Sequence, residues 1–297
     1  MRSARRRKLK SRGRGVWKKG RFLPVIILTI IFAFCLWFFV LSAHFWNGSD
    51  KIAVTVKTEN NGVSVVIFDP KLEEITSLIV SGDTEVNVAR NLGVMRLKNV
   101  WQLGENEGVS GKLVAETVTN NFRFVSFLWT TVPNGGRSLF TPGKTNISFR
   151  DRLGMLLFSS KIGNSGRTEI DLGENQFLQK GKLSDGENGF KISENLLGRL
   201  TIYFSDYELT AAAVRAFIND ETGEFGVANE FGKILQIMGA KVVSIDKKTL
   251  SEKDCIVSGG ERAYVKKIAS AFSCKEDIAG DKNVITIDIG SKFAKRF

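Results

Sequence analysis

We predict an α/β (α+β) fold in which a single N-terminal transmembrane helix precedes a mixed α/β exported domain and a small β-α-β-β-α-β sandwich domain. Three observations support this prediction. Residues 22–46 contain no Asp, Glu, Lys or Arg. Short β-branched runs of alternating polarity follow between residues 51 and 88. From residue 211 onward, apolar runs of strand length alternate with two stretches of helical periodicity.

The apolar run 22–46 is the predicted membrane span. As a helix it would extend roughly 37 Å, which exceeds the hydrocarbon core of a bilayer at about 30 Å. Residues 1–21 carry eleven Lys or Arg and no acidic residue, so the rest of this +12 chain is nearly neutral. Because positively charged flanks stay in the cytoplasm, we expect 1–21 to be a cytoplasmic tail rather than a nucleic-acid patch. Everything after residue 46 would then lie outside the cell membrane.

A cleaved signal peptide is the competing interpretation of the same run. The apolar region of a signal peptide usually spans about 7–15 residues and ends in a small-x-small pattern. Here the run is longer, and Leu41 occupies the position where the first small residue should stand. We therefore favour an uncleaved single-pass anchor.

The region 51–205 reads as one mixed α/β domain. Alternating β-branched runs separated by turn residues predict a meander of three strands and a short fourth strand, at 51–59, 63–68, 74–80 and 85–88. Apolar spacing predicts helices over 111–124, 146–162 and 192–205, and Ser148 is placed to cap the second. A short strand is expected at 168–172. Gly and charged residues dominate 173–189, which predicts a surface loop.

The region 210–297 has the clearest pattern. Strands are predicted at 211–218, 240–245, 254–257 and 284–289, and amphipathic helices at 226–238 and 261–272. This order gives the β-α-β-β-α-β sandwich. Its size, about 85 residues, is common for an independent small domain.

Cysteine and histidine limit the chemistry. Cys255 and Cys274 form an exported pair, which an oxidising compartment would bridge, although two buried thiols are the alternative. The single histidine, His44, lies in the predicted span. A Ser-His-Asp triad, a Cys-His dyad and a His-ligated zinc are therefore excluded from the exported part. We expect no metal site and name no catalytic residue.

The last region resembles a known domain. Strand 214–218 runs into Asn219, and Thr222-Gly223 then leads through Glu224-Phe225-Gly226 into a helix. With the closing strand 284–290, this pattern resembles the LytR C-terminal domain of bacterial envelope proteins over about 211–293. The resemblance implies a ligand-binding loop at Asn219, Thr222 and Gly223. The residues by themselves favour a capping loop at a helix N-terminus, although such a terminus is also a natural anion site.

The preceding region is similar to the LytR-CpsA-Psr domain. Residues 65–70 and 75–88 resemble a strand pair and a Pro-Arg-Asp-Thr loop of that family. The resemblance implies transfer of a polyprenyl-pyrophosphate-linked glycopolymer to the cell wall, with arginines holding the pyrophosphate and an Asp helping to hold a metal. Here Gly82 stands in the place of the arginine, while Asp83 and Thr84 are retained. They are candidates for a vestigial phosphate or metal loop, although an ordinary turn with side-chain-to-backbone hydrogen bonds is the favoured interpretation of the same residues.

A second arginine is missing where residues 59–62 stand in the place of an Arg-Ser-Asp-Thr element of the family. The missing arginines favour a non-catalytic role, because phosphoryl transfer depends on positive charge at the transferring oxygens. The expected function is that of a single-pass cell-envelope protein that presents its last domain to cell-wall polymer or envelope partners, without a cofactor. One alternative is a divergent glycopolymer phosphotransferase, which would use Mg²⁺. Another is a bitopic division or envelope scaffold. Two arginine side chains meeting near Asp83 in a cleft would favour the transferase.

Overall fold

The computed structural model describes residues 27–30, 45–132, 143–175, 177–193, 200 and 202–297. The predicted cytoplasmic tail and all of the predicted span except 27–30 and 45–46 lie outside these residues. Within the described part of the chain, no helix has the length and apolarity that crossing a membrane requires. Residues His44–Phe297 form one compact unit of mixed α/β structure.

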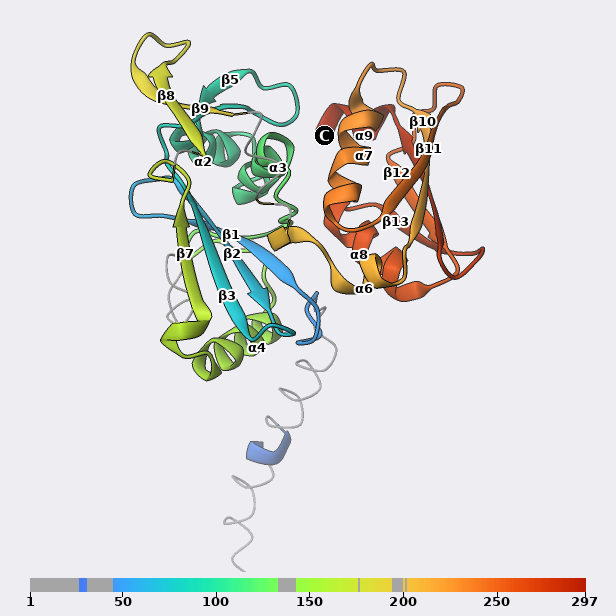
Figure 1. Ribbon diagram of the computed structural model, residues 1–297, viewed down its shortest axis with the longest axis horizontal. Coiled ribbons are helices and arrows are strands. Elements are labelled where there is room, and N and C mark those ends of the chain that lie inside the picture. The colour runs from blue at the N-terminus through green and yellow to red at the C-terminus, as the bar shows by residue number, and fades with distance from the viewer. Residues whose placement is uncertain (1–26, 31–44, 133–142, 176, 194–199, 201) are drawn as a thin grey trace, which may run out of the picture. The chain divides into compact units, whose positions relative to one another are not determined.

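The first sheet has five strands in the order β6-β1-β2-β3-β7 (Figure 1). Its centre is the predicted meander, in which neighbouring strands are antiparallel. The edge strands β6 and β7 run parallel to β1 and β3 respectively. The bounds are β1 (Ile52–Lys57), β2 (Val63–Asp69), β3 (Glu74–Val80), β6 (Leu128–Thr130) and β7 (Arg167–Asp171).

Two helices cover one face of this sheet. They are α2 (Leu97–Asn106) and α3 (Gly111–Phe122), and their apolar side chains join those of β2 and β3 in one core. A third helix, α4 (Phe149–Lys161), lies at the end of the sheet where the β2–β3 turn is found (Figure 1). Ser148 caps it as predicted, because its Oγ accepts a hydrogen bond from the backbone N–H of Asp151.

Two parts of the first region differ from the prediction. The prediction of a surface loop over 173–189 is wrong, because β8 (Leu178–Lys182) and β9 (Asn188–Ile192) form a hairpin there. Residues 94–106, for which no element was predicted, form β5 (Val94–Arg96) and then α2. Strand β5 pairs with β4 (Glu85–Asn87). A short 3₁₀ helix, Asn164–Gly166, precedes β7. Of the helix predicted over 192–205, residues 200 and 202–204 are helical, whereas 194–199 and 201 lie outside the described residues.

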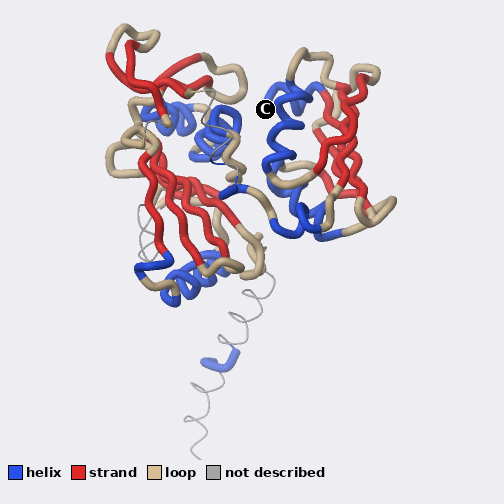
Figure 2. Tube along the Cα trace, in the orientation of Figure 1, coloured by secondary structure: helices blue, strands red, loops and turns tan. Residues whose placement is uncertain are grey.

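The second sheet has the strand order β11-β10-β14-β12-β13. Strand β10 runs parallel to both of its neighbours, and β12 is antiparallel to β14. The two helices α7 and α8 lie on one face of the sheet and supply most of the helical side of its core (Figure 2). The strands are β10 (Arg215–Glu221), β11 (Lys241–Lys247), β12 (Cys255–Gly259), β13 (Lys275–Ile278) and β14 (Val284–Gly290), and the helices are α7 (Val227–Ile237) and α8 (Arg262–Phe272).

This region also departs from the prediction at its ends. Residues Tyr207–Ala211 form a short helix, α6, so the strand expected from residue 211 begins at Arg215. Strand β13 and the final helix α9 (Ser291–Arg296) were not expected. A disulfide joins Cys255 and Cys274, whose Cα atoms are 4.9 Å apart, and it ties the start of β12 to the residue before β13.

The Asp151 carboxylate connects the start of the described compact unit to α4. It accepts hydrogen bonds from the backbone N–H groups of Phe45 (3.0 Å) and Trp46 (3.1 Å) and from the hydroxyl of Ser148 (2.9 Å). The Asp151 side chain is buried. The Trp46 ring then packs against Phe158 of α4 and Phe68 of β2, at centroid distances of 5.8 and 6.0 Å. The predicted end of the span is therefore wrong: Phe45 and Trp46 belong to the folded region, where they are fixed against α4 and the sheet.

We predict that Asp151→Asn lowers the free energy of unfolding by about 2–4 kcal/mol, because two buried N–H donors would lose a charged acceptor. Thermal unfolding of residues 45–297 followed by circular dichroism measures this change. Glu276→Gln on the exposed strand β13 is the matched control and should leave stability unchanged. Equal stability of the two variants would show that these hydrogen bonds do not hold the segment in place.

Candidate functional site

The largest described cavity lies between the first sheet and α4, with a volume of about 920 Å³. This is near the upper end of the range of about 300–1,000 Å³ that small-molecule sites usually occupy. Strands β1, β2, β3 and β7 form its floor, and α4 and residues 130–132 form its walls. Its apolar lining residues are Val54, Val56, Val66, Phe68, Ile75, Ile79, Val80, Val132, Ile147, Met155 and Leu156.

The alternation of the strands explains this floor. Side chains two residues apart point to the same face of a strand. In β2, Val63, Val65 and Ile67 pack against the core under α2 and α3, whereas Val66 and Phe68 face the cavity. Both faces of the sheet are therefore apolar, although helices α2 and α3 cover only one of them. The second face can hold an apolar ligand.

Charged groups lie at two places along the cavity. Lys57 and Glu59 line it where the β1–β2 turn approaches Gly82. On the α4 side, Arg152 and Arg167 line it, and the guanidinium of Arg167 donates to the backbone carbonyl of Ser159 at 2.5 Å. The edge strand β7 adds the carboxylates of Glu169 and Asp171. An apolar floor with charged groups beside it suits an amphiphilic ligand.

The structure places the predicted loop residue Asp83 next to this cavity, which extends to Ser81 and Gly82. The Asp83 carboxylate accepts hydrogen bonds from Lys98 Nζ (2.7 Å) and from Arg96 Nη1 (2.9 Å). The hydrogen bond from Lys98 has the largest effect and that from Arg96 the next, and together they lower the pKa of Asp83 below its usual value. Asp83 is thus held in an ion pair with two cations that sequence reasoning did not identify.

Arg96 also binds a second carboxylate, 89 residues away in the chain. Its Nε and Nη2 donate to Asp185 at 2.6 and 3.2 Å. The Arg96 guanidinium and the N–H of Glu187 hold the pKa of Asp185 at about 2, and the two carboxylates in turn raise the pKa of Arg96. Asp185 lies in the turn between β8 and β9. The sequence offered no signal for this pairing, because that segment was expected to be a loop.

Thr84, the second predicted loop residue, is fully buried. Its backbone N–H donates to the carbonyl of Ser81 at 3.1 Å, and its Oγ1 has no hydrogen-bond partner among the described residues. Thr84 does not line the cavity. No group of three acidic, His or Cys side chains in the described part of the chain is placed to hold a metal ion.

The predicted loop of the last region is stabilised by its own side chains. Asn219 lies within β10 rather than in a loop, and its amide donates to the Asp288 carboxylate at 2.7 Å. Thr222 is buried, and both its N–H and its hydroxyl donate to Asp220. Gly223 has a φ of +72°, which favours glycine. Thr222 and Gly223 thus lie in the connection between β10 and α7, whose N-cap is Gly226, and no cavity is described beside them.

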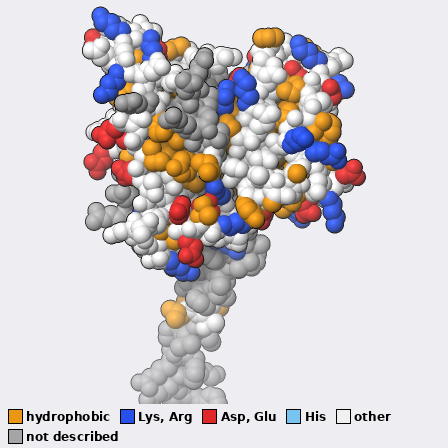
Figure 3. Space-filling model, viewed as in Figure 1, with side chains coloured by type: hydrophobic (Ala, Val, Ile, Leu, Met, Phe, Trp, Pro, Cys, Tyr) orange, Lys and Arg blue, Asp and Glu red, His pale blue; other side chains and the backbone are white. Residues whose placement is uncertain are grey.

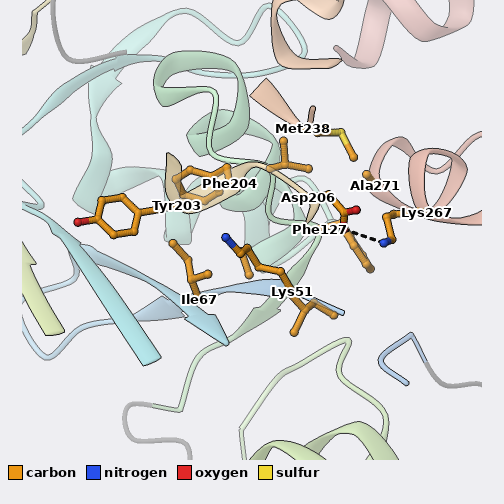
Figure 4. A pocket seen from close by; sticks show the side chains of 12 residues that line it. Lys51, Ile67, Phe127, Tyr203, Phe204, Asp206, Met238, Lys267 and Ala271 are labelled. Carbon is orange, nitrogen blue, oxygen red and sulfur yellow. Dashed lines mark hydrogen bonds and ion pairs between the residues drawn. The ribbon is translucent and has the colours of Figure 1, made fainter. Parts of the chain in front are cut away.

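A second, much smaller cavity of about 70 Å³ lies where β1 meets residues 203–206 and α8. Lys267 of α8 and Asp206 point toward each other at its edge, with 2.7 Å between Nζ and Oδ2 (Figure 4). Burial alone would lower the pKa of Lys267, but Asp206 and Asp50 outweigh it and raise that pKa. The space is too small for more than a few waters. We regard this cavity as part of the packing.

Comparison with known proteins gives a likeness of fold. No family model matches the chain, and no curated protein matches it. Bacillus subtilis TagT is similar over 53% of this chain and 91% of its own, with 13% identity and a TM-score of 0.41. The LytR-CPS2A-psr family protein YwtF (TagT), solved with bound octaprenyl pyrophosphate lipid, covers 53% and 90%, with 14% identity and a TM-score of 0.40. B. subtilis TagV is similar over 52% of this chain and 95% of its own, with 12% identity and a TM-score of 0.39.

We predict that Arg96→Gln raises the pKa of Asp185 from about 2 toward its ordinary 3.8, because the main group that stabilises the carboxylate is removed. In the native chain the Arg96–Asp185 interaction is fully present above pH 4. It is lost as the pH falls through the folded pKa of about 2. Carboxyl chemical shifts in an NMR titration measure both values. An unchanged Asp185 pKa in the variant would show that Arg96 does not hold it, and Lys241→Gln is a control at a distant surface.

Proposed function

We propose that this chain is a cell-envelope protein that binds the isoprenoid chain of a polyprenyl-phosphate-linked cell-wall polymer in the cavity between the first sheet and α4. The observation that carries the proposal is the apolar floor. Strand residues such as Val54, Val66 and Ile79 face a space of about 920 Å³. Each buried CH₂ group of a ligand contributes about 0.8 kcal/mol, so an extended hydrocarbon suits this surface better than a sugar does.

The charged groups support an amphiphile with a phosphate rather than a simple hydrocarbon. Lys57 lies at one end of the cavity and Arg152 and Arg167 on the α4 side. A guanidinium or ammonium group binds phosphate through charge-assisted hydrogen bonds. The resemblance of residues 65–88 to the LytR-CpsA-Psr domain supports the same class of ligand.

Transferase activity is the second candidate. It is favoured by the end of the cavity at Ser81 and Gly82, directly before the retained Asp83. Against it, one arginine, Arg96, contacts Asp83 among the described residues, and the second cation there is Lys98. Both roles require the lipid, so the apolar floor of the cavity does not by itself distinguish the non-catalytic role from the transferase. No observation among the described residues favours the scaffold alternative.

The Mg²⁺ that the transferase would use does not fit the residues at Asp83. This carboxylate is already paired with Lys98 and Arg96. Hard divalent cations need several oxygen ligands. The ammonium group of Lys98 and the guanidinium group of Arg96, both bound to this carboxylate, would repel a cation there. We therefore derive no step through a metal ion.

We predict that Ser77→Trp weakens binding of a fluorescent polyprenyl phosphate at least about tenfold, because the indole would fill the space on β3 that the lipid chain needs. Fluorescence titration of the full chain in detergent measures the dissociation constant. Thr168→Trp is the matched control, because this exposed residue on β7 does not line the cavity. Absence of lipid binding by the unmodified chain, or equal binding by both variants, would reject the proposal.

The same preparation distinguishes the two candidates. The full chain is incubated with a polyprenyl-pyrophosphate-linked glycopolymer and peptidoglycan, with and without Mg²⁺. Transfer of polymer that Ser77→Trp abolishes would establish the transferase. Binding without transfer under both conditions would establish the non-catalytic role.

A further inference from the structure

We infer that α4 rests in the outer surface of the lipid bilayer, so that the cavity beneath it opens toward the membrane from which its ligand comes. This inference rests on the proposed function and extends it, because it assigns the route by which the lipid reaches the cavity. The partner surface is the phospholipid bilayer itself.

The first observation is the composition of α4. Met155 packs into the core with Trp46 and Phe68, while Leu156 and Ser159 face the cavity. Phe149, Leu153 and Leu157 follow one another at intervals of four residues and therefore form a separate stripe along the helix. Phe149 and Leu157 are 51% and 54% exposed. Arg150, Arg152 and Lys161 flank this stripe, and the Arg152 guanidinium lies 5.9 Å from the Phe149 ring centroid. An exposed apolar stripe with basic neighbours is the composition of a helix at a membrane surface.

The second observation is that other exposed apolar side chains gather at the same end of the first sheet. Phe45 is 44% exposed and precedes Trp46, which packs on α4. Leu72, 65% exposed, lies in the turn between β2 and β3. The register places that turn beside the start of β1, since Phe68 pairs with Ile52 and Asp69 with Glu74. On the face shown in Figure 3, acidic and basic side chains are interspersed, and apolar side chains also form a group in the middle of the left-hand part.

The third observation is the attachment of the chain. The predicted span ends at Trp46, and the N–H groups of Phe45 and Trp46 are hydrogen-bonded to Asp151 in the first turn of α4. Because Phe45 and Trp46 are held in the folded region, the membrane-crossing part of the predicted span ends before residue 45, and the sequence places no charged residue between the two. Lys161 in the last turn is exposed and can place its ammonium group among lipid phosphates. The attachment therefore selects the bilayer over a protein partner as the cover of this stripe.

Photo-cross-linking of the full chain in vesicles of phosphatidylglycerol and phosphatidylethanolamine tests the position of α4. Benzoylphenylalanine is introduced at position 157 or, as the control, at position 278, where Ile278 of β13 is similarly exposed at 49%. We expect phospholipid adducts in at least about tenfold higher yield at 157, because an interfacial helix buries its apolar side in the acyl boundary. Equal yields, or adducts at neither position, would overturn the inference.

Lipid transfer provides a second test. The double variant Phe149→Gln and Leu157→Gln should take up a fluorescent polyprenyl phosphate from vesicles about tenfold more slowly, while its affinity in detergent stays unchanged. Ile278→Gln should change neither quantity. Unchanged uptake from vesicles would overturn the assigned route. Failure of every form to bind the lipid in detergent would instead reject the proposed function, whereas the cross-linking yields would still decide whether α4 contacts the bilayer.

Discussion

The buried carboxylate of Asp151 is the interaction on which the arrangement around the cavity depends. A carboxylate that leaves water must be compensated by several donors, and here two backbone N–H groups and a hydroxyl provide them. These donors belong to the segment at 45–46 and to the cap of α4. The carboxylate therefore fixes the position of α4 relative to residues 45–46. The Trp46 ring packs between α4 and β2, so the helix is held at the end of the sheet.

A second constraint comes from the pleat of the first sheet. Its strands must bury one face under α2 and α3, and the residues between those core positions point to the other face. If that second face were exposed to water, the period of two would favour polar residues there. Instead Val54, Val66 and Ile79 face the cavity. Apolar side chains thus line a face of the first sheet on which, among the described helices, α4 packs at one end. This is the physical basis for expecting a hydrocarbon ligand.

The sequence predicted well those elements that carry their own pattern. Strands 63–69 and 74–80 follow from β-branched alternation, and the cap at Ser148 follows from its position before an acidic first turn. Helix α2 could not be found in this way, because it begins after Arg96 with neither a side-chain cap nor an acidic first turn. The hairpin of β8 and β9 consists largely of exposed polar residues and glycine. The site was harder still: the contact of Arg96 with Asp185 joins residues 89 apart, and the cavity exists only through the distance between α4 and the sheet.

The ion pairs near Gly82 bear on the two candidate functions. Arg96 and Lys98 are the cations closest to the retained Asp83, and each already contacts a carboxylate. A phosphate bound there would have to displace Asp83 from Lys98 or Asp185 from Arg96, and the released carboxylate would then repel it. Because Asp83 and Asp185 are both about half exposed, water can solvate a displaced carboxylate at modest cost. Lipid binding in the apolar floor needs no such exchange. Transfer chemistry at Asp83 would therefore require a rearrangement of these pairs, whereas a binding role can use the cavity in its present form.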